Sequence, residues 1–134
     1  MGAATLTAYA DYHDTWKPVM RESDLASSSH VINEGSYYLS QDISAEDTLV
    51  VQSGTVRICL HGHTLSSVSG TSAIRVQGGA SLFIEDCSGG KGAIVNSKSH
   101  GLEVFGGSVR LICGRIEAAT NGVVVNRGAL LVSG

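Results

Sequence analysis

His61 and His63, two residues apart in the segment LHGHTL, are the first side chains whose type and spacing could do chemistry. On a strand they would share a face, and with a third ligand they could chelate a metal ion. No third ligand is evident in the sequence. Alternatively, Gly62 permits a bend and His63 stacks or hydrogen-bonds within a corner. We favour this second interpretation and predict no metal site and no cofactor.

The cysteines, Cys59, Cys87 and Cys113, match no zinc-binding pattern. The chain has no Cys-x-x-Cys, and no histidine stands three to five residues from another. An odd number of cysteines leaves at least one thiol unpaired in a monomer.

The carboxylates do not form a recognisable catalytic set. Glu85 and Asp86 are adjacent, so on a strand they point to opposite faces and cannot flank a glycosidic bond together. A calcium-dependent lyase would need a cluster of acids, but acidic residues occur only in short runs such as 46–48 and 85–87 or singly, as at Glu117. Nucleophile-elbow and phosphate-loop patterns are absent. The sequence therefore favours a protein that is not an enzyme.

The composition predicts one folded domain rich in short strands. A length of 134 residues suffices for one core, and 43% hydrophobic against 16% charged residues is far from the disordered regime. Seventeen glycines and a single proline favour strands and tight turns over helices. A formal charge of −3 without any Lys/Arg run argues against a nucleic-acid partner, and no apolar run is long enough to span a membrane.

Four segments repeat one pattern of strand, glycine and strand. They are residues 48–60, 73–85, 101–113 and 122–134, with the glycines Gly54, Gly79, Gly107 and Gly128 at steps of 25, 28 and 21 residues. Alternation places one apolar set of each first strand on a common face, namely Leu49 and Val51, Ile74 and Val76, Leu102 and Val104, and Val123 and Val125. The repeat therefore predicts stacked, equivalent units.

A third, shorter stretch closes each unit, at residues 63–67, 92–97 and 114–119. Three short strands per unit of this length are the signature of a parallel β-helix. An antiparallel sandwich also suits a glycine-rich all-β chain, but it does not require the same order at every period. The predicted fold is all-β, a right-handed single-stranded parallel β-helix of about four coils with an N-terminal capping segment.

Residues before the repeat are expected to cover its first coil. We predict a flexible segment at 1–13, a cap at 14–36, and coils at 37–134 that are open at the C-terminal end. Within the cap, Trp16, Met20 and Leu25 could line one side of a short helix that begins after Pro18. Residues 36–43 would then form the first strand.

Several motifs resemble a known family. SYYLSQDI at 36–43, RICLHGHTL at 57–65 and AIRVQGGASLFIEDCSGG at 73–90 are similar to secreted or cell-surface right-handed β-helix proteins with a pectate-lyase-like fold, common in gut-dwelling Gram-positive bacteria. The resemblance covers about residues 35–134, with His61 where Asn is usual, and the chain looks like the N-terminal piece of a longer helix. It implies an extracellular or cell-surface location, with a signal peptide not present in this chain.

Outward residues of neighbouring coils suggest surface contacts. Arg75 and Glu103 occupy equivalent positions, which predicts an exposed cross-strand ion pair. Arg57 and Arg110 are two coils apart with Phe83 near the coil between them, which fits a cation–π stack or a binding groove. Arg57, Phe83, Arg110 and Arg75 are therefore the candidate ligand-binding residues.

The cysteines step by 28 and 26 residues, close to one coil, so all three should lie on roughly the same side. We predict that Cys59 and Cys87 are close together, with a disulfide possible in an oxidising compartment, and that Cys113 is free and largely buried. We also predict an end-to-end homodimer through the final coil, where Val123, Val125, Leu130 and Val132 would lack a covering coil.

The leading functional hypothesis is a non-catalytic extracellular module of a bacterial surface protein, used for adhesion to glycans or to a host surface protein. A second hypothesis is a spacer or stalk with no ligand. A third is a fragment of a polysaccharide lyase or hydrolase whose active site lies on coils missing from this chain.

Overall fold

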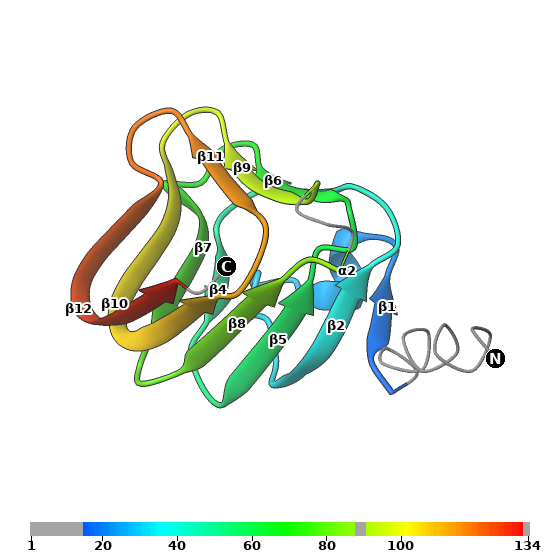
Figure 1. Ribbon diagram of the computed structural model, residues 1–134, viewed down its shortest axis with the longest axis horizontal. Helices are drawn as coiled ribbons and strands as arrows, with labels where there is room; N and C mark the ends of the chain where they lie inside the picture. The colour runs from blue at the N-terminus through cyan, green and yellow to red at the C-terminus, as the bar shows by residue number, and fades with distance from the viewer. Residues whose placement is uncertain (1–14, 88–90, 133–134) are drawn as a thin grey trace, which may run out of the picture.

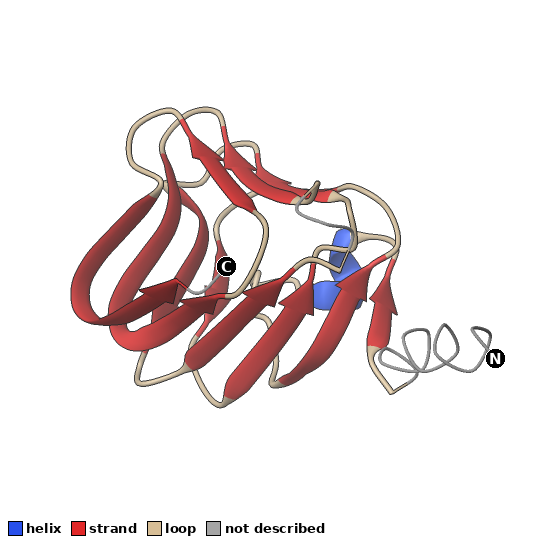
Figure 2. Ribbon diagram, viewed as in Figure 1, coloured by secondary structure: helices blue, strands red, loops and turns tan. Residues whose placement is uncertain are grey.

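The chain winds into a parallel β-solenoid of about five turns, with 58% of the described residues in strands and 3% in helix (Figures 1 and 2). The computed structural model describes residues 15–87 and 91–132. Every pairing between its named strands is parallel, which excludes the antiparallel sandwich and confirms the predicted β-helix. The segment predicted to be flexible, 1–13, lies outside the described residues.

The strands form three faces that the chain visits in turn. The elements are β1 (Lys17–Val19), α2 (Glu22–Leu25), β2 (Gly35–Leu39), β3 (Ile43–Ala45), β4 (Leu49–Val51), β5 (Thr55–Cys59), β6 (Thr64–Ser67), β7 (Ser72–Gln77), β8 (Ser81–Glu85), β9 (Ala93–Asn96), β10 (His100–Leu111), β11 (Arg115–Ala118) and β12 (Val123–Val132). The first face stacks β1, β2, β5, β8 and the second halves of β10 and β12. The second stacks β3, β6, β9 and β11, and the third stacks β4, β7 and the first halves of β10 and β12.

Ladders of equivalent apolar residues fill the interior. Leu49, Ile74, Leu102 and Val123 are register partners on the third face, as the repeat predicts, and the first three are fully buried. Val56, Leu82 and Val109 form the matching ladder on the first face. Each fully buried side chain of this kind contributes about 1.5–3 kcal/mol. The ladder repeats every turn, so the register is held by burial along the whole solenoid.

Glycines make the corner between the third and first faces. Gly107 and Gly128 are register partners at the point where β10 and β12 bend from one face to the other. A Cβ atom at Gly107 would lie 2.5 Å from the carbonyl oxygen of Ala80, and Gly128 has a φ of +111°. The repeated glycine is therefore required by close packing at one corner and by backbone conformation at the next.

The N-terminal segment differs from prediction. Residues around Pro18 form the edge strand β1 beside β2, and the helix begins only at Glu22. An edge strand accepts proline, which has no N–H to donate to the ladder. Leu25 is buried, but Met20 is 49% exposed, so the prediction that Trp16, Met20 and Leu25 line one side of a helix beginning after Pro18 is wrong. The predicted strand at 36–43 is likewise two strands, β2 and β3, separated by a turn.

The same segment borders the first turn of the solenoid. β1 pairs with β2, while the backbone of His30 and Ile32 hydrogen-bonds to Val50 in β4. Two of the three faces are therefore extended by residues that precede β2. This arrangement satisfies backbone groups that an uncovered strand edge would leave to water. The limits predicted for the cap and the coils remain predictions.

Candidate functional site on the outer face

Outward side chains of the first face form one continuous row. Register pairs connect Ser36 of β2, Arg57 of β5, Phe83 of β8, Arg110 of β10 and Leu131 of β12, which we call the outer row. Their inward neighbours are the core ladders, because side chains alternate along each strand. The Arg57 guanidinium carbon lies 4.3 Å from the centroid of the Phe83 ring, which is the predicted cation–π contact.

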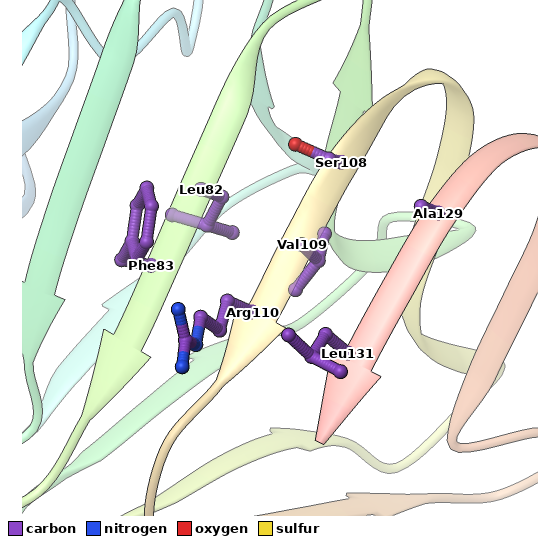
Figure 3. A pocket seen from close by; sticks show the side chains of 7 residues that line it. All are labelled: Leu82, Phe83, Ser108, Val109, Arg110, Ala129 and Leu131. Atoms are coloured by element: carbon purple, nitrogen blue, oxygen red, sulfur yellow. The ribbon is translucent and has the colours of Figure 1, made fainter. Parts of the chain in front are cut away.

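A shallow hollow lies beside this contact. It has a volume of about 250 Å³ and is lined by Leu82 and Phe83 of β8, Ser108, Val109 and Arg110 of β10, and Ala129 and Leu131 of β12. Figure 3 shows these side chains on three neighbouring strands, with Arg110 between Phe83 and Leu131. The small side chain of Ala129 leaves space between the larger ones. Hydroxyls of Ser81 and Ser108, 3.1 Å apart, supply polar groups one row away.

The two arginines of the outer row are exposed cations. Within residues 15–87 and 91–132, the carboxylate ion pairs of arginine involve Arg21, Arg75 and Arg115, and neither Arg57 nor Arg110 is among them. Glu85 is two residues beyond Phe83 on the same side of β8, so one acidic group lies at the end of this region. The hollow therefore has a mostly aliphatic lining with one aromatic and one cationic side chain, and among the described residues Glu85 is an acid near its end.

Arg75 lies elsewhere and has a different environment. It projects from β7 on the third face, where Nη2 lies 3.2 Å from Glu103 Oε1 and the guanidinium carbon 5.5 Å from the Phe105 ring centroid. Glu103 is only 8% exposed, so the prediction of an exposed pair is wrong. Its register partners Arg75 and Val124 flank it on both sides. Arg75 therefore neutralises a buried carboxylate and does not join the outer row.

A second cluster lies one row further along the same face. Cys59 Sγ and Cys87 Sγ are 2.9 Å apart, and His61 Nδ1 is 3.1 Å from Cys87 Sγ; these three residues are the thiol cluster. Their potential ligand atoms all lie within 4.8 Å of one another. The proximity of the two sulfurs follows from their spacing of about one turn, whereas the disulfide itself stays a prediction.

His63 does not belong to this cluster. His61 has a φ of +53° in the turn after β5, so the two histidines are not on one strand face as the chelation hypothesis required. His63 Nδ1 instead lies 3.4 Å from an exposed carboxylate oxygen of Asp42. The donors that do come together are one histidine and two cysteines. The step of one turn predicted that Cys59 and Cys87 are close together, but it did not place His61 beside them.

Cys113 is half-buried, not largely buried as predicted. The pairing of Leu111 with Ile84 places it level with Asp86, in the turn that follows β10. A position beyond the strand loses the strict alternation that would have placed its side chain inside. Cys113 is therefore a separate thiol.

Buried polar contacts hold the turns around the thiol cluster. Asp86 is 5% exposed, and its carboxylate accepts hydrogen bonds from the backbone N–H groups of Gly62, at 2.8 Å, and Gly92, at 2.7 Å. The Tyr38 ring packs edge-on against His61, with centroids 5.8 Å apart. Burial, followed by the hydrogen bond with Cys87, raises the pKa of Cys59 to about 12.

Comparison with models of known families, with curated proteins and with solved structures finds no match. The parallel solenoid is compatible with the β-helix fold that the sequence resemblance implies, whereas no family match supports the resemblance itself. None of the described helices has the length and apolar character needed to cross a membrane.

Proposed function

We propose that this chain is a non-catalytic binding module of an extracellular bacterial surface protein, and that its outer row binds acidic carbohydrate. The observation that carries the proposal is the hollow between Phe83, Arg110 and Leu131, flanked by a second arginine that stacks on Phe83. The extracellular location rests on the sequence resemblance. Binding to a host surface protein is the competing outcome.

The chemistry of the outer row suits a sugar that carries a carboxylate or sulfate. An aromatic ring offers an apolar surface to the C–H face of a pyranose, while hydroxyls such as those of Ser81 and Ser108 hydrogen-bond to its polar edge. A guanidinium binds carboxylate or sulfate through two parallel hydrogen bonds. Arg110 is exposed and forms no ion pair with the described carboxylates, so no internal partner has to be displaced.

The shape of the site limits the expected ligand. At about 250 Å³ the hollow is slightly below the usual range of roughly 300–1,000 Å³ for small-molecule sites. It would hold one sugar unit, with the rest of a chain lying across the sheet. We therefore expect modest affinity for one site, which falls as salt screens the two exposed arginines.

The test is a glycan array followed by titration calorimetry of the best ligand. Uronic-acid or sulfated glycans should bind, and neutral glycans of the same backbone should not. Arg110→Ala should weaken binding by about tenfold, the usual cost of one charge-assisted contact. Arg115→Ala is the matched control, because Arg115 is exposed on β11 and pairs with Glu117 at 3.0 Å. Binding that survives Arg110→Ala, or no glycan binding at all, would remove the proposal and leave the spacer role.

We also propose self-association through β12. Its residues Val125, Leu131 and Val132 are 44%, 53% and 61% exposed, and among the described strands β12 pairs only with β10. A second copy that places its own β12 alongside would cover these side chains. Light scattering at roughly 100 μM should give the dimer mass, and Val125→Lys should give the monomer mass through charge repulsion and lost apolar contact. A monomer for the unaltered chain would contradict the dimer.

A further inference from the structure

We propose that Cys87 and Cys59 form a thiol–disulfide exchange site, in which Cys87 is the thiol that attacks an external disulfide, His61 accepts its proton, and Cys59 resolves the mixed disulfide. The co-substrate is a low-molecular-weight disulfide such as oxidised glutathione. The site does not depend on carbohydrate binding. It gives the thiol cluster a chemical role beyond structural pairing.

The geometry places each group for its step. Cys87 Sγ lies 2.9 Å from Cys59 Sγ on one side and 3.1 Å from His61 Nδ1 on the other. With its proton on Nε2, the His61 ring accepts the thiol proton at Nδ1. The thiolate is the nucleophile in disulfide exchange, so a neighbouring proton acceptor raises the rate of attack.

The two thiols differ in accessibility in the way that an exchange pair needs. Cys87 is exposed, whereas Cys59 is fully buried beneath it. An external disulfide can therefore reach Cys87 first, and the mixed disulfide forms directly above the second thiol. The raised pKa of Cys59 keeps this thiol protonated until the mixed disulfide is in place.

The reaction balances without another reagent. The Cys87 thiolate attacks one sulfur of the external disulfide, which breaks that S–S bond, forms a mixed disulfide and releases one thiolate. Protonated His61 returns its proton to that thiolate. His61, neutral again and with its ring nitrogen within 4.8 Å of Cys59 Sγ, then accepts the Cys59 proton as Cys59 attacks Cys87 Sγ, and passes it to the second external group, which leaves as a thiol. Two protein thiols are oxidised to one disulfide, and one external disulfide is reduced to two thiols.

A zinc site fits the same atoms less well. Two sulfurs on a tetrahedral zinc, each at about 2.3 Å, stand well over 3 Å apart, and the fourth position needs a further ligand. Here the sulfurs are 2.9 Å apart, and the cluster among the described residues holds three donors. Contact between the sulfurs favours bond formation between them.

The bond would join successive turns of the solenoid. Cys59 is the last residue of β5, and Cys87 lies just beyond the end of β8. Because β5 and β8 are paired neighbours on the first face, the bond would join two successive turns at that face. Asp86, next to Cys87 in the chain, already ties Gly62 and Gly92 to the same region through its carboxylate. Oxidation therefore stiffens the end of the face that carries the outer row.

The experiment uses the full chain with Cys113→Ser, which removes the separate thiol. The reduced protein is incubated with oxidised glutathione, and adducts are counted by mass spectrometry over time. The parent should lose both thiols with only a transient adduct. Cys59→Ser should accumulate a stable glutathione adduct on Cys87, whereas Cys87→Ser should react at least tenfold more slowly, because its remaining thiol is buried.

His61 is tested in the Cys59→Ser background, where a single attack is observed. His61→Gln should slow adduct formation by at least threefold near pH 7, whereas His63→Gln, two residues away, should leave the rate unchanged. Circular dichroism confirms that each variant keeps its strands. Attack through Cys59, or equal rates for the two histidine variants, would overturn the proposal. Zinc that binds one equivalent and protects both thiols from glutathione would also overturn it.

Discussion

Two arginines of this solenoid stack on phenylalanines, and the two contacts have different consequences. Arg57 lies over Phe83 at 4.3 Å on the first face, and Arg75 lies near Phe105 at 5.5 Å on the third. Only Arg75 has a carboxylate, that of Glu103, beside it. The same residue pair is thus part of the internal structure at one face and an open cationic surface at the other. The difference lies in one neighbouring residue.

Removal of the cation should have its largest effect at the third face. Arg75→Ala leaves the nearly buried carboxylate of Glu103 without its partner. We therefore expect a loss of about 2 kcal/mol in the free energy of unfolding. Arg57→Ala, at an exposed site, should cost less than about 0.5 kcal/mol. Urea denaturation measures both.

A rescue variant sharpens this prediction. Glu103→Gln replaces the carboxylate by a neutral amide, so Arg75→Ala should be less harmful in that background than alone. Equal losses for Arg75→Ala and Arg57→Ala would show that Glu103 is solvated in solution and that the two faces do not differ.

Removal of the aromatic ring should have its main effect at the first face. Phe83→Ala removes the apolar wall of the hollow and should weaken binding of an acidic glycan by about tenfold, as expected for an aromatic contact. Phe105 lies outside the hollow, so Phe105→Ala should leave the affinity for the glycan unchanged. Calorimetric titrations of the two variants give the comparison. Equal losses would place the ligand on both faces.

A smaller effect concerns the pH dependence of stability. The pKa of Cys59 in the folded chain is raised from 9.0 to about 12, so the folded state holds its proton more tightly than the unfolded state does. The contribution of this protonated thiol to the free energy of unfolding is fully present below about pH 9 and is lost as the pH rises toward 12. The stability difference between the reduced chain and Cys59→Ser should therefore shrink between pH 8 and pH 10.5 in urea denaturation. A difference that stays constant would show that Cys59 titrates normally.

Periodicity predicted much of what the two faces contain. The step of about one turn aligned Arg57, Phe83 and Arg110, and it paired Arg75 with Glu103, because parallel strands repeat their outward positions in register. It also identified the apolar ladders and the glycine corners. Such features need only the local alternation and the length of the repeat.

Features that depend on turns could not be predicted in the same way. The position of His61 next to Cys87 requires a left-handed backbone at His61 and a turn held by Asp86, neither of which follows from alternation. The start of the helix at Glu22 was also missed, because the pairing of Pro18 with β2 overrides the preference of proline for a first helical turn.

The amino-acid sequence by itself determined the solenoid, its register and the residues that share each outward row, because burial of one side of every strand leaves a single compatible stacking. The tertiary structure decided the environment of each outward side chain. Glu103 is buried because its neighbours on both adjacent strands cover it, whereas Arg57 and Arg110 remain open to solvent. Exposure, and with it the charge available to a ligand, depends on neighbours that are one turn away in space and more than twenty residues away in the chain.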